Sequence, residues 1–367
     1  MSNIYMDNAA TTKVREEVSD SMISVLKNNY GNPSSSHSYG RSARSIIELS
    51  RNEIAKILNV KNSEIIFTSG GTEGNNLALS QYGRVITSSI EHDSVRAVNN
   101  KCLIAPVDAN GVIKLDSLSD ILDKVTVSEK DDIILSVMAA NNETGVLQPI
   151  EQIAEMALRA GIAFHSDMVQ FFGKHKINFA SSQISYASIS AHKIGGPTGV
   201  GALLVQPGCK VKSLLKGGGQ ERGSRAGTEN LVGIAGFSGA VKDAFDDIGH
   251  YKKMAKWRDC FEKQILAERS GVEVFGKAAE RLGNTSCIAV AGRLAENMVI
   301  AFDLAGVAVS AGAACSSGKV KSSHVLDAMG AGERAREAIR ISGGWATVKS
   351  DFETLADVFL QLYKRSA

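Results

Sequence analysis

The feature that most constrains the fold is a regular alternation of short apolar runs with helical patterns between Ile65 and Val205. The apolar runs predict strands at 65–68, 85–88, 103–107, 133–138, 162–167, 184–190 and 201–205. Helical patterns at 72–80, from Ser94 onward, at 115–122 and at 150–159 separate most of these strands. Such alternation predicts an α/β fold in which a largely parallel sheet is covered by helices on both faces.

The pattern changes on either side of this region. Before it, a loop-rich N-terminal segment surrounds a predicted helix at 16–27, and a second helix is predicted at 43–58. After Gly217-Gly218-Gly219, helical segments extend from Asn230 to about Arg269, followed by strands at 272–275 and 286–290 and a last helix near Tyr363. A chain of 367 residues, 44% of them hydrophobic, can bury more than one core. We therefore predict a large α/β domain at 1–250 and a smaller α+β domain at 251–367.

Charge and hydropathy exclude several classes of partner. The chain has 41 Lys and Arg residues against 39 Asp and Glu residues, with the signs intermixed, so no basic stripe is available for nucleic acid. The apolar runs are too short to span a membrane, and the first residues lack the basic start and apolar middle of a signal peptide. We expect a cytoplasmic protein that acts on small molecules.

The cysteines argue against disulfide bonds and against a metal site. No two of the five form a CxxC pair, and the rest of the chain has an intracellular character. Cys102 and Cys287 lie in apolar runs typical of core strands, whereas Cys315 lies in a loop of small residues at 310–318. Cys315 is therefore the thiol from which we expect reactivity.

Lys193 is a candidate for covalent chemistry with an aldehyde. It follows the predicted strand at 184–190 and precedes Gly195-Gly196-Pro197, which predicts a turn, so the lysine would project from a rigid edge. A lysine attacks an aldehyde only as the neutral amine, and partial burial or a cationic neighbour lowers the pKa enough to supply it. The alternative is an ordinary lysine in solvent.

The run Ser69-Gly70-Gly71-Thr72-Glu73 also follows a predicted strand and opens a helix. Free N–H groups and the helix dipole at such a position can bind a phosphate, although the same residues can serve as a plain helix cap. Neither GxxxxGK[ST] nor GxGxxG occurs in the chain, which argues against P-loop NTPases and dinucleotide-binding enzymes.

Asp167 ends an apolar strand, where a carboxylate is costly unless a cation pairs with it. A protonated pyridine nitrogen would serve, through a hydrogen bond worth about 1.5–3 kcal/mol. The alternatives are a carboxylate paired with an arginine or one that caps the next turn. Alternation along the strand places His165, Asp167 and Val169 on one face. His92 likewise follows a predicted strand, either as a helix-start residue or as a stacking partner for a ring.

The ordered set of motifs resembles the pyridoxal-phosphate enzymes of the class V aminotransferase family, and within it the cysteine desulfurases of the NifS/IscS type. The resemblance covers nearly the whole chain. It rests on 7–12, 31–35, 68–73, 91–92, 141–145, 167 with 170, 190–193, 217–223 with 225 and 227–228, 314–316 and 339–340. It implies a large fold type I domain, together with a smaller α+β domain formed by the C-terminal part and the N-terminal segment.

The resemblance also implies a role for each matching residue. It implies that pyridoxal 5'-phosphate is bound covalently by Lys193, held at its pyridine nitrogen by Asp167 and stacked on by His92, which also takes part in catalysis. Asn142 and Gln170 would hydrogen-bond its phenolic oxygen, and Asn142 and Arg340 would bind the substrate, Arg340 through the carboxylate. The phosphate would be bound by Gly71, Thr72, Ser190, His192 and, from the second subunit of a homodimer, Thr228.

The implied reaction removes sulfur from L-cysteine, giving L-alanine and a persulfide on Cys315, and supplies an iron–sulfur scaffold or another sulfur-acceptor protein. Lys193 would act as the base. A class V aminotransferase, a selenocysteine lyase and a degenerate binding protein are the alternatives. Two departures from the family pattern are Met168, where relatives usually carry alanine, and the alanines at 311 and 313, where many carry serine.

Overall fold

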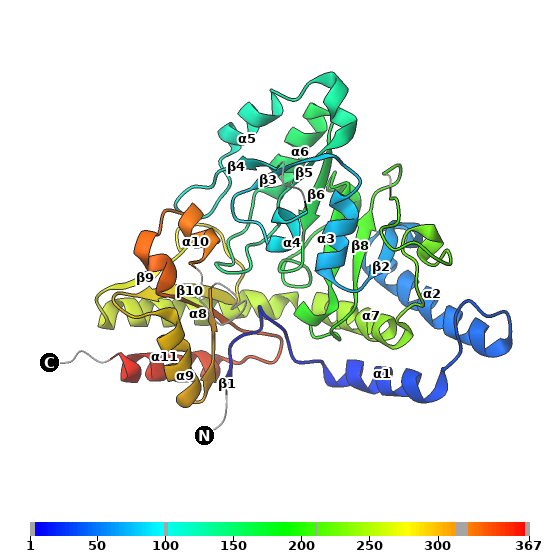
Figure 1. Ribbon diagram of the computed structural model, residues 1–367. Helices are drawn as coiled ribbons and strands as arrows, with labels where there is room; N and C mark the ends of the chain where they lie inside the picture. The colour runs from blue at the N-terminus through cyan, green and yellow to red at the C-terminus, as the bar shows by residue number, and fades with distance from the viewer. Residues whose placement is uncertain (1–3, 99–101, 210, 313–321, 364–367) are drawn as a thin grey trace.

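The computed structural model describes residues 4–98, 102–209, 211–312 and 322–363 (Figure 1). Within these residues, a seven-stranded sheet has the strand order β2-β8-β7-β6-β5-β3-β4. The strands are β2 (Ile65–Thr68), β3 (Arg84–Ser88), β4 (Leu103–Ala105), β5 (Ile133–Ser136), β6 (Ala163–Asp167), β7 (Tyr186–Ser190) and β8 (Gly201–Val205). The pairs from β4 through to β7 are parallel, whereas β8 runs antiparallel to both β7 and β2.

Helices cover both faces of this sheet, as the alternation predicted. On one face α3 (Gly71–Leu79) packs against β7 and β8. The other face buries a large apolar cluster that includes residues of α2 (Ser38–Leu58), α6 (Ile150–Ala160) and α7 (Leu231–Asp246). Helix α1 (Glu16–Asn28) lies along α7 (Figure 1). The remaining helices of this part are α4 (Asp93–Arg96) and α5 (Leu115–Leu122).

The C-terminal part has its own antiparallel sheet, in the order β12-β13-β10-β9. Its strands are β9 (Val272–Val274), β10 (Thr285–Val290), β12 (Ser310–Ala311) and β13 (Ala338–Ser342), and its helices are α8 (Ile248–Glu268), α9 (Ala295–Leu304), α10 (His324–Ala328) and α11 (Lys349–Leu362).

The N-terminal segment joins this second sheet region. Strand β1 (Ile4–Tyr5) pairs with β11 (Val307–Ala308), and Met6 is fully buried in the same apolar cluster as α8 and α11 (Figure 1). Asp7 forms a bridge with Ser342. The two ends of the chain therefore build the smaller part together, whereas the division at residue 250 stays a prediction.

Most predicted elements are present, with shifted ends. The helix predicted at 43–58 begins at Ser38, because His37 caps it by accepting a hydrogen bond from the Gly40 N–H. The helix predicted from Ser94 onward ends after a single turn at Arg96, and the strand predicted at 103–107 ends at Ala105. None of the described helices has the length and hydropathy that a membrane span needs.

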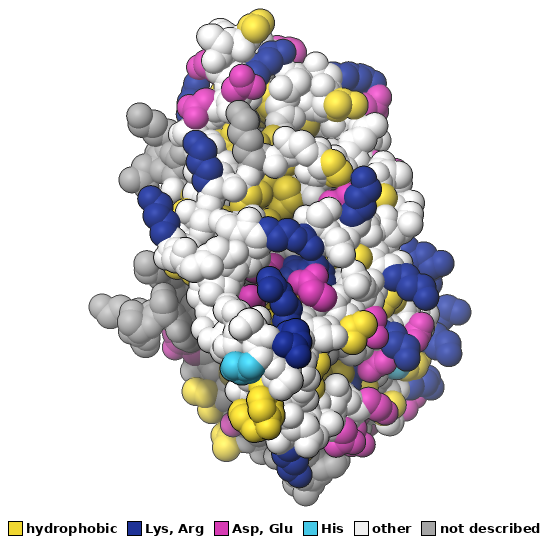
Figure 2. All heavy atoms as spheres, turned by 90° about the vertical axis from the view of Figure 1, so that its right-hand side faces the viewer, with side chains coloured by type: hydrophobic (Ala, Val, Ile, Leu, Met, Phe, Trp, Pro, Cys, Tyr) yellow, Lys and Arg dark blue, Asp and Glu magenta, His cyan; other side chains and the backbone are white. Residues whose placement is uncertain are grey.

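One face of the molecule is shown in Figure 2, and on it Lys and Arg side chains are interspersed with Asp and Glu side chains.

Candidate active site

The candidate site lies at the carboxyl ends of the parallel strands, where α/β sheets bind ligands. Asp167 is the last residue of β6 and Ser190 the last of β7, and His92 caps α4 after β3. The N-terminal segment crosses this edge, since the Thr12 N–H donates to the His192 carbonyl at 2.9 Å. Strand β13 brings Arg340 to the same place.

Lys193 ends the one-turn helix η4 (Ala191–Lys193), which continues directly from β7. Its Nζ donates to the carbonyl oxygens of Ala9 and Ala10, each at 2.6 Å. Burial and the nearby Arg340 charge lower the pKa of Lys193 to about 8, although Asp7 and Asp167 oppose the shift. A useful fraction of this lysine is therefore a neutral amine at neutral pH, as imine chemistry requires.

Asp167 is a buried carboxylate, 7% exposed. Its Oδ2 accepts a hydrogen bond from Asn75 Nδ2 at 2.7 Å and its Oδ1 accepts one from the Val169 N–H at 2.9 Å. Among the described residues no lysine, arginine or histidine forms an ion pair with it, and Arg340 pairs with Asp7 instead. The described residues thus offer no arginine partner for Asp167, and a cationic ring nitrogen would fit beside this carboxylate.

Asn75 is a site residue that the sequence did not reveal. It lies in α3 and its Nδ2 also donates to Ser94 Oγ at 2.8 Å, while Ser94 Oγ lies 2.8 Å from His92 Nδ1. The Ser94 N–H donates to the same Nδ1, so that nitrogen accepts and the serine hydroxyl donates to it. A chain of hydrogen bonds thus joins His92 to Asp167. The sequence feature that could have identified Asn75 is its place one turn into the helix that follows the glycine pair.

A cradle for an anion forms where α3 begins. Ser190 Oγ is buried and has no hydrogen-bond partner among the described residues. Gly70 has a φ of 150°, and a Cβ at Gly71 would lie only 2.4 Å from Val169 Cγ2, so both glycines are needed for the backbone to pass. Thr72 lies in the first turn of α3, where the backbone N–H groups have no partner within the helix.

His192 lies beside this cradle, with Nδ1 3.2 Å from Thr11 Oγ1. Burial and the charges of Lys193 and Lys174 lower the pKa of His192 to about 4, so the ring is neutral and has one N–H to donate. Thr228 of the same chain lines a surface cavity with Ser69 and Arg225. Its expected action on a second subunit stays a prediction.

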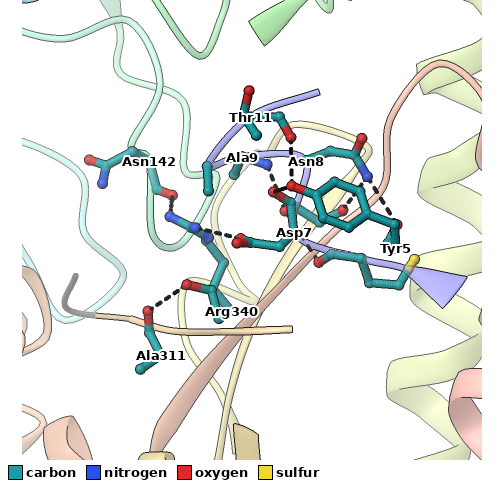
Figure 3. Close-up of polar contacts among 12 residues, drawn as sticks. Tyr5, Asp7, Asn8, Ala9, Thr11, Asn142, Ala311 and Arg340 are labelled. Carbon is teal, nitrogen blue, oxygen red and sulfur yellow. Dashed lines mark hydrogen bonds and ion pairs between the residues drawn. The ribbon is translucent and has the colours of Figure 1, made fainter. Parts of the chain in front are cut away.

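Arg340 lies on β13 with its guanidinium between two segments (Figure 3). One Nη donates to Asp7 Oδ1 at 2.7 Å and the other to the Asn142 carbonyl at 3.1 Å, while the buried Nε has no partner within the described parts of the chain. Arg340 therefore forms a salt bridge with Asp7 in this structure. An arginine 7% exposed with a free donor can also bind a carboxylate that competes with Asp7.

Gln170 connects the N-terminal segment to a second lysine. Its Nε2 donates to the Ala9 carbonyl at 2.8 Å, and its Oε1 accepts from Lys174 Nζ at 2.9 Å. Burial, together with the charges of Lys193 and Arg340, lowers the pKa of Lys174 to about 7. The sequence did not single out Lys174, because a lysine after a glycine in a loop is ordinarily solvated.

Two glutamates next to predicted site residues, Glu91 and Glu143, are buried. Glu91 is fully buried and accepts hydrogen bonds from Ser88 Oγ and the Met138 N–H, and burial raises its pKa to about 8. Glu143 accepts from Ser323 Oγ, and burial raises its pKa to about 7. Both belong to motifs that carry the resemblance, and each directly adjoins a predicted site residue in the sequence, Glu91 before His92 and Glu143 after Asn142.

Cys315 lies outside the described residues, as do the flanking residues 313–321. Ser310 lies opposite Arg340 in the β12–β13 ladder. Burial raises the pKa of Cys287 well above its ordinary value, and Cys260 is exposed. Met168 is buried in the large core, 1% exposed.

The residues present fit pyridoxal phosphate. Lys193 offers a neutral amine, and Asp167 offers a buried carboxylate that no described cation pairs with. Ser190 offers a buried hydroxyl, beside the glycine cradle, to which no described residue hydrogen-bonds. These three groups match the aldehyde, the pyridine nitrogen and the phosphate of that cofactor.

Comparisons with known proteins agree with this geometry. The family profile described as Aminotransferase class-V matches residues 4–355. The chain is 38% identical to "Cysteine desulfurase IscS" of Dictyoglomus turgidum, over 99% of this chain and 95% of that protein. It is 37% identical to "Putative cysteine desulfurase IscS 1" of Bacillus subtilis, over 100% of both chains.

Solved structures show the same fold. The NifS-like protein from Rickettsia africae superposes with a TM-score of 0.91 at 36% identity, covering 99% of this chain and 100% of that chain. A structure titled "SspA in complex with cysteine" has a TM-score of 0.78 at 30% identity, covering 94% of this chain and 100% of that chain. The predicted fold class is thereby confirmed. The chain belongs to the class V aminotransferase family of pyridoxal-phosphate-dependent enzymes, and within it to the cysteine desulfurases.

Proposed function

We propose that this protein is a cysteine desulfurase that converts L-cysteine to L-alanine and retains the sulfur as a persulfide on Cys315. The observation that carries the proposal is the grouping of a half-buried Lys193, a buried Asp167 without a cation and Arg340 at one sheet edge. The relatives named cysteine desulfurase, which match nearly the whole chain, supply the substrate.

Binding and orientation come from three groups of this chain. Ser190, His192 and the N–H groups at Gly71 and Thr72 would hold the cofactor phosphate, and Asp167 would hold the pyridine nitrogen. His92, fixed through Ser94, would cover the ring. Arg340 would bind the substrate carboxylate in place of Asp7, since a planar guanidinium can donate two parallel hydrogen bonds.

The cofactor, when bound, supplies an electron sink for the α-carbon of the substrate. Lys193 Nζ, released as a neutral amine, accepts the α-proton. Cys315 Sγ then attacks the substrate sulfur as a thiolate, so an S–S bond forms and the substrate C–S bond breaks. The electron pair of that bond stays with the carbon skeleton, which takes up a proton and leaves as alanine.

We further propose a cytoplasmic homodimer that passes the sulfur to an iron–sulfur scaffold or another acceptor protein. The support is the match of the motif containing Thr228, whose role in the family is to reach the phosphate of the second subunit. A mixed dimer of one Lys193→Ala and one Thr228→Ala protomer tests this role. If Thr228 acts across the dimer, the site that keeps Lys193 also receives an intact Thr228 and binds cofactor with wild-type affinity.

The direct test is release of alanine and sulfide from L-cysteine by the purified holoenzyme in the presence of a thiol reductant. We expect equal amounts of both products from the wild type, and loss of both from Cys315→Ser, with cofactor binding unchanged. Peptide mapping after a single cysteine pulse should place the persulfide on Cys315. Sulfide release by Cys315→Ser at the wild-type rate, or transamination without sulfide in the wild type, would contradict the proposal.

A further inference from the structure

Lys174 is a buried lysine for which the proposed reaction has no use. It follows Gly173 in the loop after β6, and it is 5% exposed. No carboxylate forms an ion pair with it among the described residues, and its Nζ donates a hydrogen bond to Gln170 Oε1 at 2.9 Å. A buried ammonium without an anion is costly, so its retention calls for a function.

The contact with Lys174 fixes the orientation of the Gln170 amide. While Lys174 is protonated it can only donate hydrogen bonds, so Gln170 turns its carbonyl oxygen toward Lys174 and its NH₂ group away from it. That NH₂ group donates to the Ala9 carbonyl, which also accepts from Lys193 Nζ. The amide nitrogen has two N–H groups, so one remains for an acceptor beside Lys193.

The charged groups that lower the pKa of Lys174 are the cations Lys193 and Arg340. Lys174 in turn lowers the pKa of the neutral His192 ring. Asp7 and Asp167 raise the pKa of Lys193 but are not among the causes of the shift at Lys174. An anionic ligand beside Lys193 would therefore supply the negative charge that this cluster lacks.

We propose that Lys174 is a positioning residue that orients the Gln170 amide so that Nε2 donates to the phenolic oxygen of the cofactor, and whose charge stabilises that oxygen as an anion. This inference rests on the proposed function, because it needs the cofactor bound at Lys193. Lys174 acts through Gln170 and by its charge, and it touches neither cofactor nor substrate.

The test compares Lys174→Met with Lys176→Met, in which an exposed lysine two residues away is changed in the same manner. We expect the cofactor dissociation constant, measured by titrating apo-protein and following absorbance, to rise about tenfold in Lys174→Met. The pH midpoint of the visible absorption band should move up by about 1 unit, because a lost positive charge favours the protonated nitrogen that joins Lys193 to the cofactor. Lys176→Met should match the wild type in both measurements.

A double-mutant cycle with Gln170→Leu separates positioning from a general effect. If Lys174 acts on cofactor affinity through Gln170, the loss from Lys174→Met should largely disappear in the Gln170→Leu background. Where Lys174→Met fails to fold, Lys174→Gln keeps a donor without the charge and should still show the upward midpoint shift. A folded variant with unchanged affinity and midpoint would overturn the inference. A wild type without a lysine-bound cofactor or cysteine turnover would instead refute the proposed function.

Discussion

Replacing Asp167 by asparagine should weaken cofactor binding and destabilise the apo-protein, and a second substitution should restore only the stability. The carboxylate accepts from Asn75 Nδ2 at 2.7 Å and from the Val169 N–H at 2.9 Å, and it has no cation partner in the described chain. A charge-assisted hydrogen bond to a protonated ring nitrogen is worth about 1.5–3 kcal/mol, which corresponds to about a 10- to 100-fold change in affinity. We expect Asp167→Asn to weaken cofactor binding by that factor.

The asparagine also destabilises the apo-protein, because its NH₂ group must face one of two donors, Asn75 Nδ2 or the Val169 N–H. The swap variant Asn75→Asp with Asp167→Asn restores the donor and acceptor pair and moves the negative charge to residue 75. We expect the swap to recover about 1–3 kcal/mol of the free energy of unfolding lost by Asp167→Asn, as a buried unsatisfied group is relieved. It should not recover cofactor affinity, since the charge no longer faces the ring nitrogen.

The assay is titration of apo-protein with pyridoxal phosphate at neutral pH, paired with denaturant unfolding of the same apo-protein. Asp120→Asn, an exposed change on α5, is the matched control and should leave both quantities at wild-type values. If Asp167→Asn binds the cofactor as tightly as the wild type, Asp167 is only a strand cap and the reasoning fails.

Three further outcomes are expected. Only the neutral amine attacks an aldehyde, and the pKa of Lys193 is lowered to about 8. The rate at which apo-protein binds the cofactor should therefore rise as the pH passes through 8 and then level off. A rate measured by stopped-flow absorbance that does not change between pH 6 and 10 would contradict this. Arg340→Lys should raise the KM for L-cysteine about tenfold with a smaller loss in kcat, since lysine lacks the bidentate fork; steady-state kinetics with an unaltered KM would exclude carboxylate binding by Arg340. In native protein, iodoacetamide should label the exposed Cys260 and leave the buried Cys287 unlabelled, because burial raises the pKa of the Cys287 thiol. Equal labelling of the two cysteines in peptide mass spectrometry would disprove that burial.

Local pattern was enough to predict the strands and helices of the large sheet region. The apolar runs of β2, β6, β7 and β8 and the glycine pair before α3 are contiguous signals, so they can be read from neighbouring residues. The same signals placed Asp167, Ser190 and Lys193 at the ends of strands. The roles of Asn142, Gln170 and Arg340 came from the resemblance to a family, because nothing in their own neighbourhood marks them.

Contacts between distant segments were decided by the tertiary structure. The antiparallel insertion of β8 between β2 and β7, and the pairing of β1 with β11, depend on which edges meet and not on local periodicity. Helix ends moved for the same reason, as when His37 extends α2 to Ser38.

The sequence by itself therefore determined the α/β class, the positions of most elements and the residues that follow the strands. Only the fold placed Asn75 against Asp167 and Lys174 against Gln170. Only it left Asp167 without a cation and Ser190 Oγ without a partner among the residues that the structure describes. The physical reason is that a buried polar group is defined by what surrounds it in space, and those surroundings come from residues that lie far apart along the chain.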